Sequence, residues 1–125
     1  MAKHLIPTLV FTLAAVTAGL AHADVPVKTS GDMLVTTAGM TLYTFDNDVA
    51  GSGKSMCNGP CATAWPPVLA QAGDAPEGAM TIITRDDGSR QWAYKGKPIY
   101  RYKSDVNPGD ATGDNFKNLW HVIKP

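Results

Sequence analysis

The chain of 125 residues contains one sequence motif twice. Residues 39–49 align without gaps onto residues 96–106, and after a gap of two residues the match continues from residues 64–68 to residues 119–123. In both copies a glycine, an aliphatic residue, a tyrosine, a second aromatic residue, an aspartate and a valine follow in the same order. Units this short cannot each bury an apolar face alone. We therefore expect the two copies to have the same local fold and to share one core.

The copies extend over about residues 32–70 and about residues 89–124. Residues 71–78 are small and polar, with Pro and Gly among them, which is typical of a connector. The whole of residues 24–125 is long enough for one domain, and we expect a single one.

Each copy has the pattern of a β-hairpin, a loop and a Trp-bearing segment. Residues 33–36 and 40–45 are β-prone runs separated around Gly39, and residues 91–94 and 98–102 are separated around Gly96. Glycine suits these turns because a positive φ costs it almost nothing.

Two further elements are predicted. Residues 80–84 and 90–94 face each other across a turn with the sequence Asp-Gly, which favours a hairpin. Residues 61–65 are expected to form one helical turn, ended by Pro66. The predicted fold is mainly β: a small single domain of two tandem, pseudo-symmetric β-hairpin repeats with short helical turns.

The N-terminal segment has the pattern of a cleaved signal peptide. Lys3 precedes an uncharged apolar run, and Ala21 and Ala23 provide the small residues that a signal peptidase requires. We predict a signal peptide over residues 1–23 and a mature chain beginning at Asp24. No Cys stands at this point to accept a lipid, so no stable membrane anchor is expected after cleavage.

The charge balance limits the classes of partner. Of eleven basic residues only Lys3 leaves with the signal peptide, whereas all eleven acidic residues remain, so the mature chain has a net charge of −1. No basic patch is present to neutralise phosphates, so neither nucleic acid nor anionic lipid is an expected partner. The expected partner is an unknown component of the cell envelope.

Cys57 and Cys61 are the two cysteines of the chain. Outside the cytoplasm such a close pair is most simply a disulfide. Two alternatives remain open: a redox-active pair, or thiolate ligands of a soft metal such as Cu(I), with Met56 and His121 as further candidate ligands.

The loops after the motif tyrosines contain several acidic residues, which suggests either turn formation or calcium binding. Structural turns are favoured because the spacing of an EF-hand is absent and Asp and Asn are ordinary turn residues. Asp48 and Asp105 occupy the same position in both copies, which predicts that both cap their loops. The acidic and amide residues of these loops are Asp46, Asn47, Asp48, Asp105, Asn107, Asp110 and Asp114.

The sequence shows no catalytic constellation. It has no G-x-S-x-G motif, no Gly-rich phosphate loop, and one His, His121, after the signal peptide. We expect no enzyme activity and no cofactor. The aromatic residues are expected mainly in the core, with a groove for sugar or peptide as the alternative; they are Tyr43, Phe45, Trp65, Trp92, Tyr94, Tyr100, Tyr102 and Trp120.

Specific blocks of the sequence resemble a known family. Residues 43–48 and 100–105 both fit the pattern Y-x-[FWY]-x-x-D, residues 57–67 fit C-x-G-x-C-A-x-x-W-P-P, and residues 85–100 are similar to the family's second-repeat block. The chain in these blocks resembles a family of bacterial secreted repeats, often described as predicted lipoproteins of unknown function. The resemblance implies an envelope location, two repeats and no established activity. Because the lipid-acceptor Cys is missing, we expect a soluble periplasmic or secreted form.

Together these observations favour a non-enzymatic binding or scaffolding module of the cell envelope. The alternative is a small periplasmic redox or metal-handling protein of the copper type that uses Cys57 and Cys61; a hydrolase of an envelope polymer is a third, weaker reading. The residues expected to matter, as structure or as a binding surface, are the repeated motif positions Tyr43, Phe45, Asp48, Trp65, Tyr100, Tyr102, Asp105 and Trp120.

Overall fold

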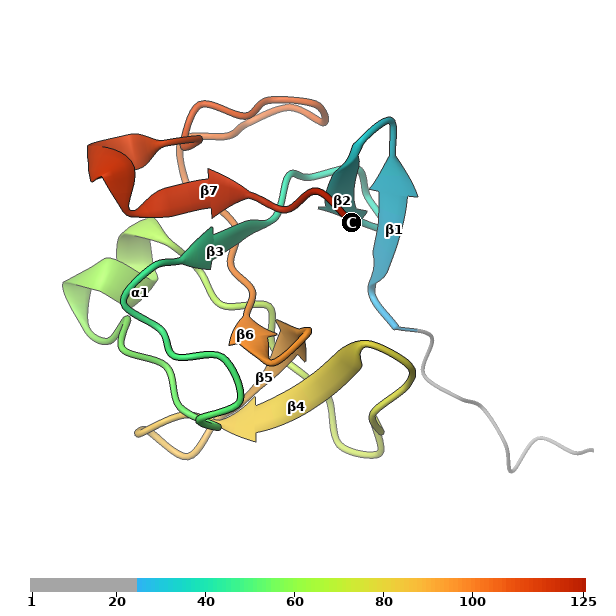
Figure 1. The fold of residues 1–125 in the computed structure, drawn as a ribbon, viewed down its shortest axis with the longest axis vertical. Helices are drawn as coiled ribbons and strands as arrows, with labels where there is room; N and C mark the ends of the chain where they lie inside the picture. Colours follow the sequence, from blue (N-terminus) through green and yellow to red (C-terminus); the bar gives the residue numbers. More distant parts are fainter. Residues whose placement is uncertain (1–24) are drawn as a thin grey trace, which may run out of the picture.

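The computed structural model describes residues 25–125, so the predicted signal peptide lies outside the described residues. The strands form three small antiparallel sheets, ordered β1-β2, β3-β7 and β4-β5-β6, with one short helix and one 3-10 turn (Figure 1). In chain order the elements are β1 (Val27–Ser30), β2 (Met33–Thr36), β3 (Tyr43–Phe45), α1 (Pro60–Ala64), β4 (Met80–Thr84), β5 (Arg90–Tyr94), β6 (Lys97–Pro98), η2 (Phe116–Asn118) and β7 (Trp120–Val122).

Each repeat begins with a hairpin, whose first strand, β1 or β4, lies before the start predicted for that repeat. The predicted hairpin of β4 and β5 is confirmed, with Thr84 opposite Arg90. Its counterpart in the first repeat, β1 with β2, was not predicted, because most of β1 is exposed and lacks a buried apolar face. The predicted hairpin of residues 33–36 with 40–45 is present but short: Val35 and Thr41 form a bridge, Thr36 N–H donates to Met40 O at 2.8 Å, and Leu42 N–H donates to Leu34 O at 3.2 Å.

The motif strand of the first repeat pairs with the second repeat, whereas β6 stays within the second repeat and pairs with β5. β3 of the first repeat pairs with β7 of the second, with Phe45 opposite Trp120. At the centre, Tyr43 N–H donates to Tyr100 O at 2.8 Å and Tyr100 N–H donates to Tyr43 O at 3.0 Å. The two motif tyrosines are thus each other's partners, as expected for equivalent residues on either side of a pseudo-two-fold axis.

The equivalent pairing on the other side of this axis, between residues 100–103 and residues 64–67, is incomplete. Arg101 N–H donates to Pro66 O at 2.8 Å and Lys103 N–H donates to Ala64 O at 2.9 Å, but Pro66 and Pro67 have no N–H to return. The predicted strand over residues 98–102 is therefore wrong in extent: β6 ends at Pro98, and Tyr100 forms only isolated bridges.

The loops that follow the motif aspartates also cross between repeats. Gly51 N–H donates to Gly96 O at 3.0 Å, and Gly109 N–H donates to Gly39 O at 3.3 Å. Gly39 and Gly96 both have a positive φ, +88° and +83°, as their turns require. Each repeat therefore covers the turn of the other.

The predicted helical turn is present as α1, with Pro60 in its first turn and Trp65 at its C-cap. No helix among residues 25–125 is long and apolar enough to cross a membrane.

The buried apolar residues form two clusters rather than the single core predicted from the sequence. Both clusters draw residues from both repeats, so neither repeat has a core of its own. The first contains Leu34, Leu42, Val68, Met80, Trp92, Ile99 and Ile123. The second contains Tyr43, Phe45, Cys57, Trp65, Tyr100 and Trp120.

Candidate functional site

The second cluster contains a stack of four aromatic rings. Trp65 and Trp120 lie face to face at the centre, with ring centroids 3.9 Å apart and planes 1° apart. Tyr102 stacks on the outer face of Trp65 at 4.0 Å, and Phe45 stacks on the outer face of Trp120 at 4.2 Å. Because Phe45 and Tyr102 are equivalent motif positions, the stack has the same pseudo-two-fold symmetry as the chain.

The motif tyrosines hold this stack from the side. Tyr43 meets Trp65 edge to face at 5.3 Å, and Tyr100 meets Trp120 edge to face at 5.1 Å. Such pairs contribute about 0.5–1.5 kcal/mol each beyond the area that they bury. The aromatic residues are thus mainly core, yet they also form one wall of an open pocket.

This aromatic pocket lies between α1, η2 and the exposed margin of the stack, and its volume is about 400 Å³. Phe116, which is 37% exposed, meets Trp65 edge to face at 5.6 Å and Tyr102 at a tilt. Sequence reasoning missed Phe116 because it lies outside the repeated motif. The lining residues are Phe45, Cys61, Ala64, Trp65, Tyr102, Lys103, Phe116, Lys117, Leu119 and Trp120.

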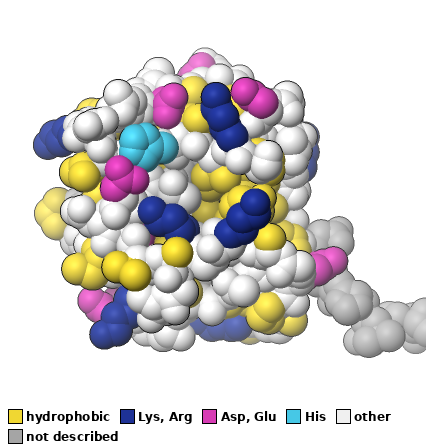
Figure 2. Space-filling view, in the orientation of Figure 1, with side chains coloured by type: hydrophobic (Ala, Val, Ile, Leu, Met, Phe, Trp, Pro, Cys, Tyr) yellow, Lys and Arg dark blue, Asp and Glu magenta, His cyan; other side chains and the backbone are white. Residues whose placement is uncertain are grey.

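The charge of this pocket differs from that of the surface in general. Lys103 and Lys117 are both exposed and line the pocket, and no carboxylate is among its lining residues. Lys117 Nζ lies 5.8 Å from the centroid of Phe116. Elsewhere, Figure 2 shows basic and acidic side chains interspersed on the face in view, without a patch of one sign.

The motif tyrosines and aspartates form hydrogen bonds between repeats. Tyr43 Oη donates to Asp105 Oδ2 at 2.5 Å, and Tyr100 Oη donates to Asp48 Oδ2 at 2.6 Å. Burial, reinforced by these carboxylates, raises the pKa of both tyrosines well above 10.0. Burial also raises the pKa of Asp48 above its ordinary 3.8, although its hydrogen bonds act in the opposite direction.

Both aspartates also bind the loops that follow them. Asp48 Oδ1 accepts Met56 N–H at 2.7 Å, and Asp105 Oδ1 accepts the N–H and the hydroxyl of Thr112 at 2.9 and 2.6 Å. This is the geometry that loop capping requires. The sequence did not predict the hydrogen bond that each aspartate accepts from the tyrosine of the other repeat, because no local pattern indicates a partner so distant in sequence.

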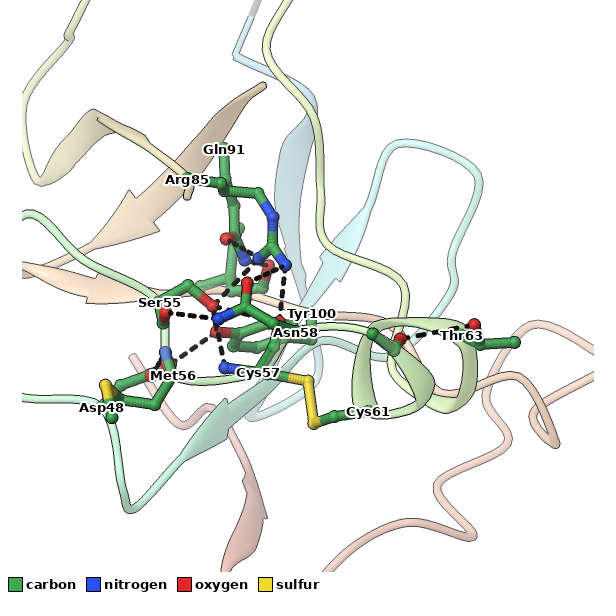
Figure 3. The surroundings of a disulfide bond; sticks show 12 residues. Asp48, Ser55, Met56, Cys57, Asn58, Cys61, Thr63, Arg85, Gln91 and Tyr100 are labelled. Carbon is green, nitrogen blue, oxygen red and sulfur yellow. Dashed lines mark hydrogen bonds between the residues drawn. A yellow bond between two sulfur atoms is a disulfide. The ribbon is translucent and has the colours of Figure 1, made fainter. Parts of the chain in front are cut away.

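Cys57 and Cys61 are joined in a disulfide, with Cys57 fully buried (Figure 3). The buried guanidinium of Arg85 holds this segment: Nη2 donates to Cys57 O at 2.5 Å, and Nη1 donates to Ser55 Oγ at 2.9 Å and to Gln91 Oε1 at 2.7 Å. Ser55 Oγ is in turn 2.6 Å from Tyr100 Oη, which connects Arg85 to Asp48. Arg85 was missed, since nothing in the sequence marks a buried arginine.

The candidate metal ligands are not brought together. Met56 is 62% exposed, and His121 Nε2 lies at hydrogen-bond distance, 2.8 Å, from Asp46 Oδ2 on the surface. Within residues 25–125 no group of three or more His, Cys, Asp or Glu side chains could hold a metal ion.

The remaining acidic loop residues bind nearby backbone. Asp110 Oδ2 accepts the N–H groups of Val106 and Asn107 at 3.1 and 2.9 Å, and Asp114 Oδ1 accepts Val122 N–H at 3.0 Å. These contacts correspond to the turn role that the sequence favoured over calcium binding.

A family model described as a secreted repeat of unknown function matches residues 25–69 and again residues 81–124. Each match begins close to the first hairpin of a repeat, so the unit of the family is the hairpin, the motif strand, the loop and the Trp-bearing segment together. Comparisons with curated proteins and with solved structures found no match. The two matches cover most of the chain, which therefore belongs to this family of secreted repeats and is an exported protein.

Proposed function

We propose that this protein is a non-enzymatic binding module of the cell envelope and that the aromatic pocket is its ligand site. The observation that carries the proposal is the open pocket of about 400 Å³ backed by the four-ring stack. This volume lies within the range of small-molecule sites, which are typically apolar and largely pre-formed.

The ring stack that backs the pocket is held in place by its neighbours. Both faces of each tryptophan are occupied by other rings, and the motif tyrosines fix the stack from the side. A wall that is already ordered loses little conformational entropy on binding, which favours affinity.

The pocket also requires both repeats. Cys61 and Ala64 come from the first repeat, whereas Tyr102, Phe116 and Lys117 come from the second. The disulfide fixes the start of α1 on one side, and η2 forms the other. A binding role thus accounts for a pocket that neither repeat forms alone.

The perturbed groups support binding rather than catalysis. Asp48, Tyr43 and Tyr100 have raised pKa values, but their polar atoms bind one another or nearby loops, and none of the three lines the pocket. The residues that do line it include no Ser, His, Asp or Glu, and its two lysines, Lys103 and Lys117, are both exposed rather than desolvated as a catalytic lysine requires.

We propose that the mature protein is located in the periplasm or outside the cell. The predicted cleavage after Ala23 and the disulfide, which forms in oxidising compartments, both support this location.

The test is binding of the neutral fluorescent probe N-phenyl-1-naphthylamine to the mature protein. We expect saturable binding that Phe116→Ala weakens at least about fivefold, since Phe116 forms one side of the pocket. Val106→Ala is the matched control, because Val106 is 75% exposed and does not line the pocket. Absence of saturable binding, or equal affinity of the two variants, would contradict the proposal.

A further inference from the structure

The two tryptophans of the aromatic pocket meet a ligand with their ring edges. Trp65 lies between Trp120 and Tyr102, and Trp120 lies between Phe45 and Trp65, so no face of either tryptophan is free. The edge of an aromatic ring carries the positive part of its quadrupole. This wall therefore favours electron-rich and negatively charged groups, and a sugar that stacks on an open tryptophan face finds no such face here.

The charged residues of the pocket have the same preference. Lys103 and Lys117 line it without an accompanying carboxylate, and within residues 25–125 neither lysine forms an ion pair. Both are therefore available to a ligand.

Lys117 is held at the pocket by an unusual backbone conformation. It has a φ of +48° in a turn in which Asn115 and Asn118 also have a positive φ. The turn is closed by Asn118 N–H donating to Asn115 O and Leu119 N–H donating to Phe116 O, both at 3.0 Å. The position of Lys117 beside Phe116 is thus fixed by the turn.

We propose that the ligand of this pocket is an apolar ring compound carrying an acidic group. The ring contacts Phe116, Tyr102 and the tryptophan edges, and the acidic group pairs with Lys103 and Lys117. The inference rests on the proposed function and adds the chemical class of the ligand to it.

The test compares two probes with one skeleton. 8-Anilinonaphthalene-1-sulfonate carries a sulfonate, whereas N-phenyl-1-naphthylamine does not. We expect Lys103→Gln and Lys117→Gln each to weaken binding of the sulfonate probe about threefold to tenfold, since each removes one charge-assisted contact. Binding of the neutral probe is expected to change less than twofold. Lys54→Gln, at an exposed lysine outside the pocket, is the matched control and should leave both affinities unchanged.

The outcomes separate the two proposals. If the neutral probe binds at Phe116 but the pocket lysine variants bind the sulfonate probe as the wild type does, the inference on ligand charge is wrong and the proposed function stands. If Lys54→Gln weakens sulfonate binding as much as the pocket variants do, general surface charge explains the effect and the inference is again wrong. If neither probe binds, both proposals fail.

Discussion

Tyr43 of the first repeat donates a hydrogen bond to Asp105 of the second, with 2.5 Å between Oη and Oδ2. The equivalent Tyr100 returns the contact to Asp48 of the first repeat at 2.6 Å. The tyrosine and the aspartate of the Y-x-[FWY]-x-x-D pattern thus act between copies, because each repeat supplies the tyrosine that the other's aspartate needs. A single repeat would leave a buried carboxylate without this donor, which gives a physical reason for the pairing of repeats.

A double-mutant cycle on Tyr100 and Asp48 tests this exchange. Tyr100→Phe is expected to lower the free energy of unfolding by about 1–3 kcal/mol, because it leaves a buried carboxylate oxygen unpaired. Combined with Asp48→Asn, the coupling energy from urea unfolding should be about 0.5–3 kcal/mol. Tyr43 with Asp48, which share no hydrogen bond, is the control pair and should be closer to additive. Equal coupling in the two pairs would contradict the exchange.

The raised pKa of Asp48 predicts a specific pH dependence of stability. A raised pKa means that the folded protein binds the proton of the Asp48 carboxyl group more tightly than the unfolded chain does. The stabilisation of the folded state by this proton is therefore fully present below pH 3.8, and it is lost as the pH rises through the raised pKa of the folded protein. The free energy of unfolding of the wild type minus that of Asp48→Asn should therefore fall across this window. At neutral pH Asp48→Asn should cost about 1 kcal/mol or less and Asp48→Ala about 1–2 kcal/mol. If this difference in the free energy of unfolding rose with pH instead, folding would stabilise the charged carboxylate of Asp48, and the prediction would be wrong.

The two turn glycines offer a matched pair of substitutions. Alanine at either position is strained by about 1–2 kcal/mol because φ is positive. At Gly96 the added Cβ would also lie 2.8 Å from the backbone N of Gly51, whereas at Gly39 it would meet the Pro108 side chain at 3.1 Å. We expect Gly96→Ala to be more destabilising than Gly39→Ala by about 1–3 kcal/mol. Urea unfolding of both variants measures this, and the reverse order would contradict the account.

Arg85 is expected to protect the disulfide as well as the fold. Lys in its place keeps the charge but loses the planar fork that reaches Cys57 O, Ser55 and Gln91 together, at a cost of about 1–3 kcal/mol. Cys57 is fully buried, so a reductant reaches it after local opening. Under native conditions Arg85→Lys should therefore be reduced by dithiothreitol faster than the wild type, whereas Arg101→Lys, at an exposed arginine, should not. Equal rates in all three proteins would argue against this role.

The sequence predicted the features that depend on local or repeated patterns. The equivalence of Tyr43 and Tyr100, the turn at Gly88 between β4 and β5, and the helical turn before Pro66 all follow from turn chemistry or from the duplication itself. The close cysteine pair likewise indicated the disulfide that the structure contains.

The features that the sequence did not predict depend on contacts between distant segments of the chain. Phe45 could have paired with any β-prone run, and its choice of Trp120 is set by the packing of the ring stack. Arg85 and Phe116 have no local signature either, because one is buried by its partners and the other is placed by a turn outside the motif. The pocket is built from such contacts, so the sequence alone did not predict it.

The most direct test of a ligand site at the aromatic pocket is a nuclear magnetic resonance titration of the mature protein with 8-anilinonaphthalene-1-sulfonate. The chain has three tryptophans, and the indole Nε1–H signal of each can be assigned by substitution with Phe. Trp65 and Trp120 line the pocket, whereas Trp92 is fully buried in the other cluster and serves as an internal control. The account predicts saturable shifts of the Trp65 and Trp120 signals with little change at Trp92. A titration that moves none of the three signals, or moves Trp92 as much as the other two, would contradict it.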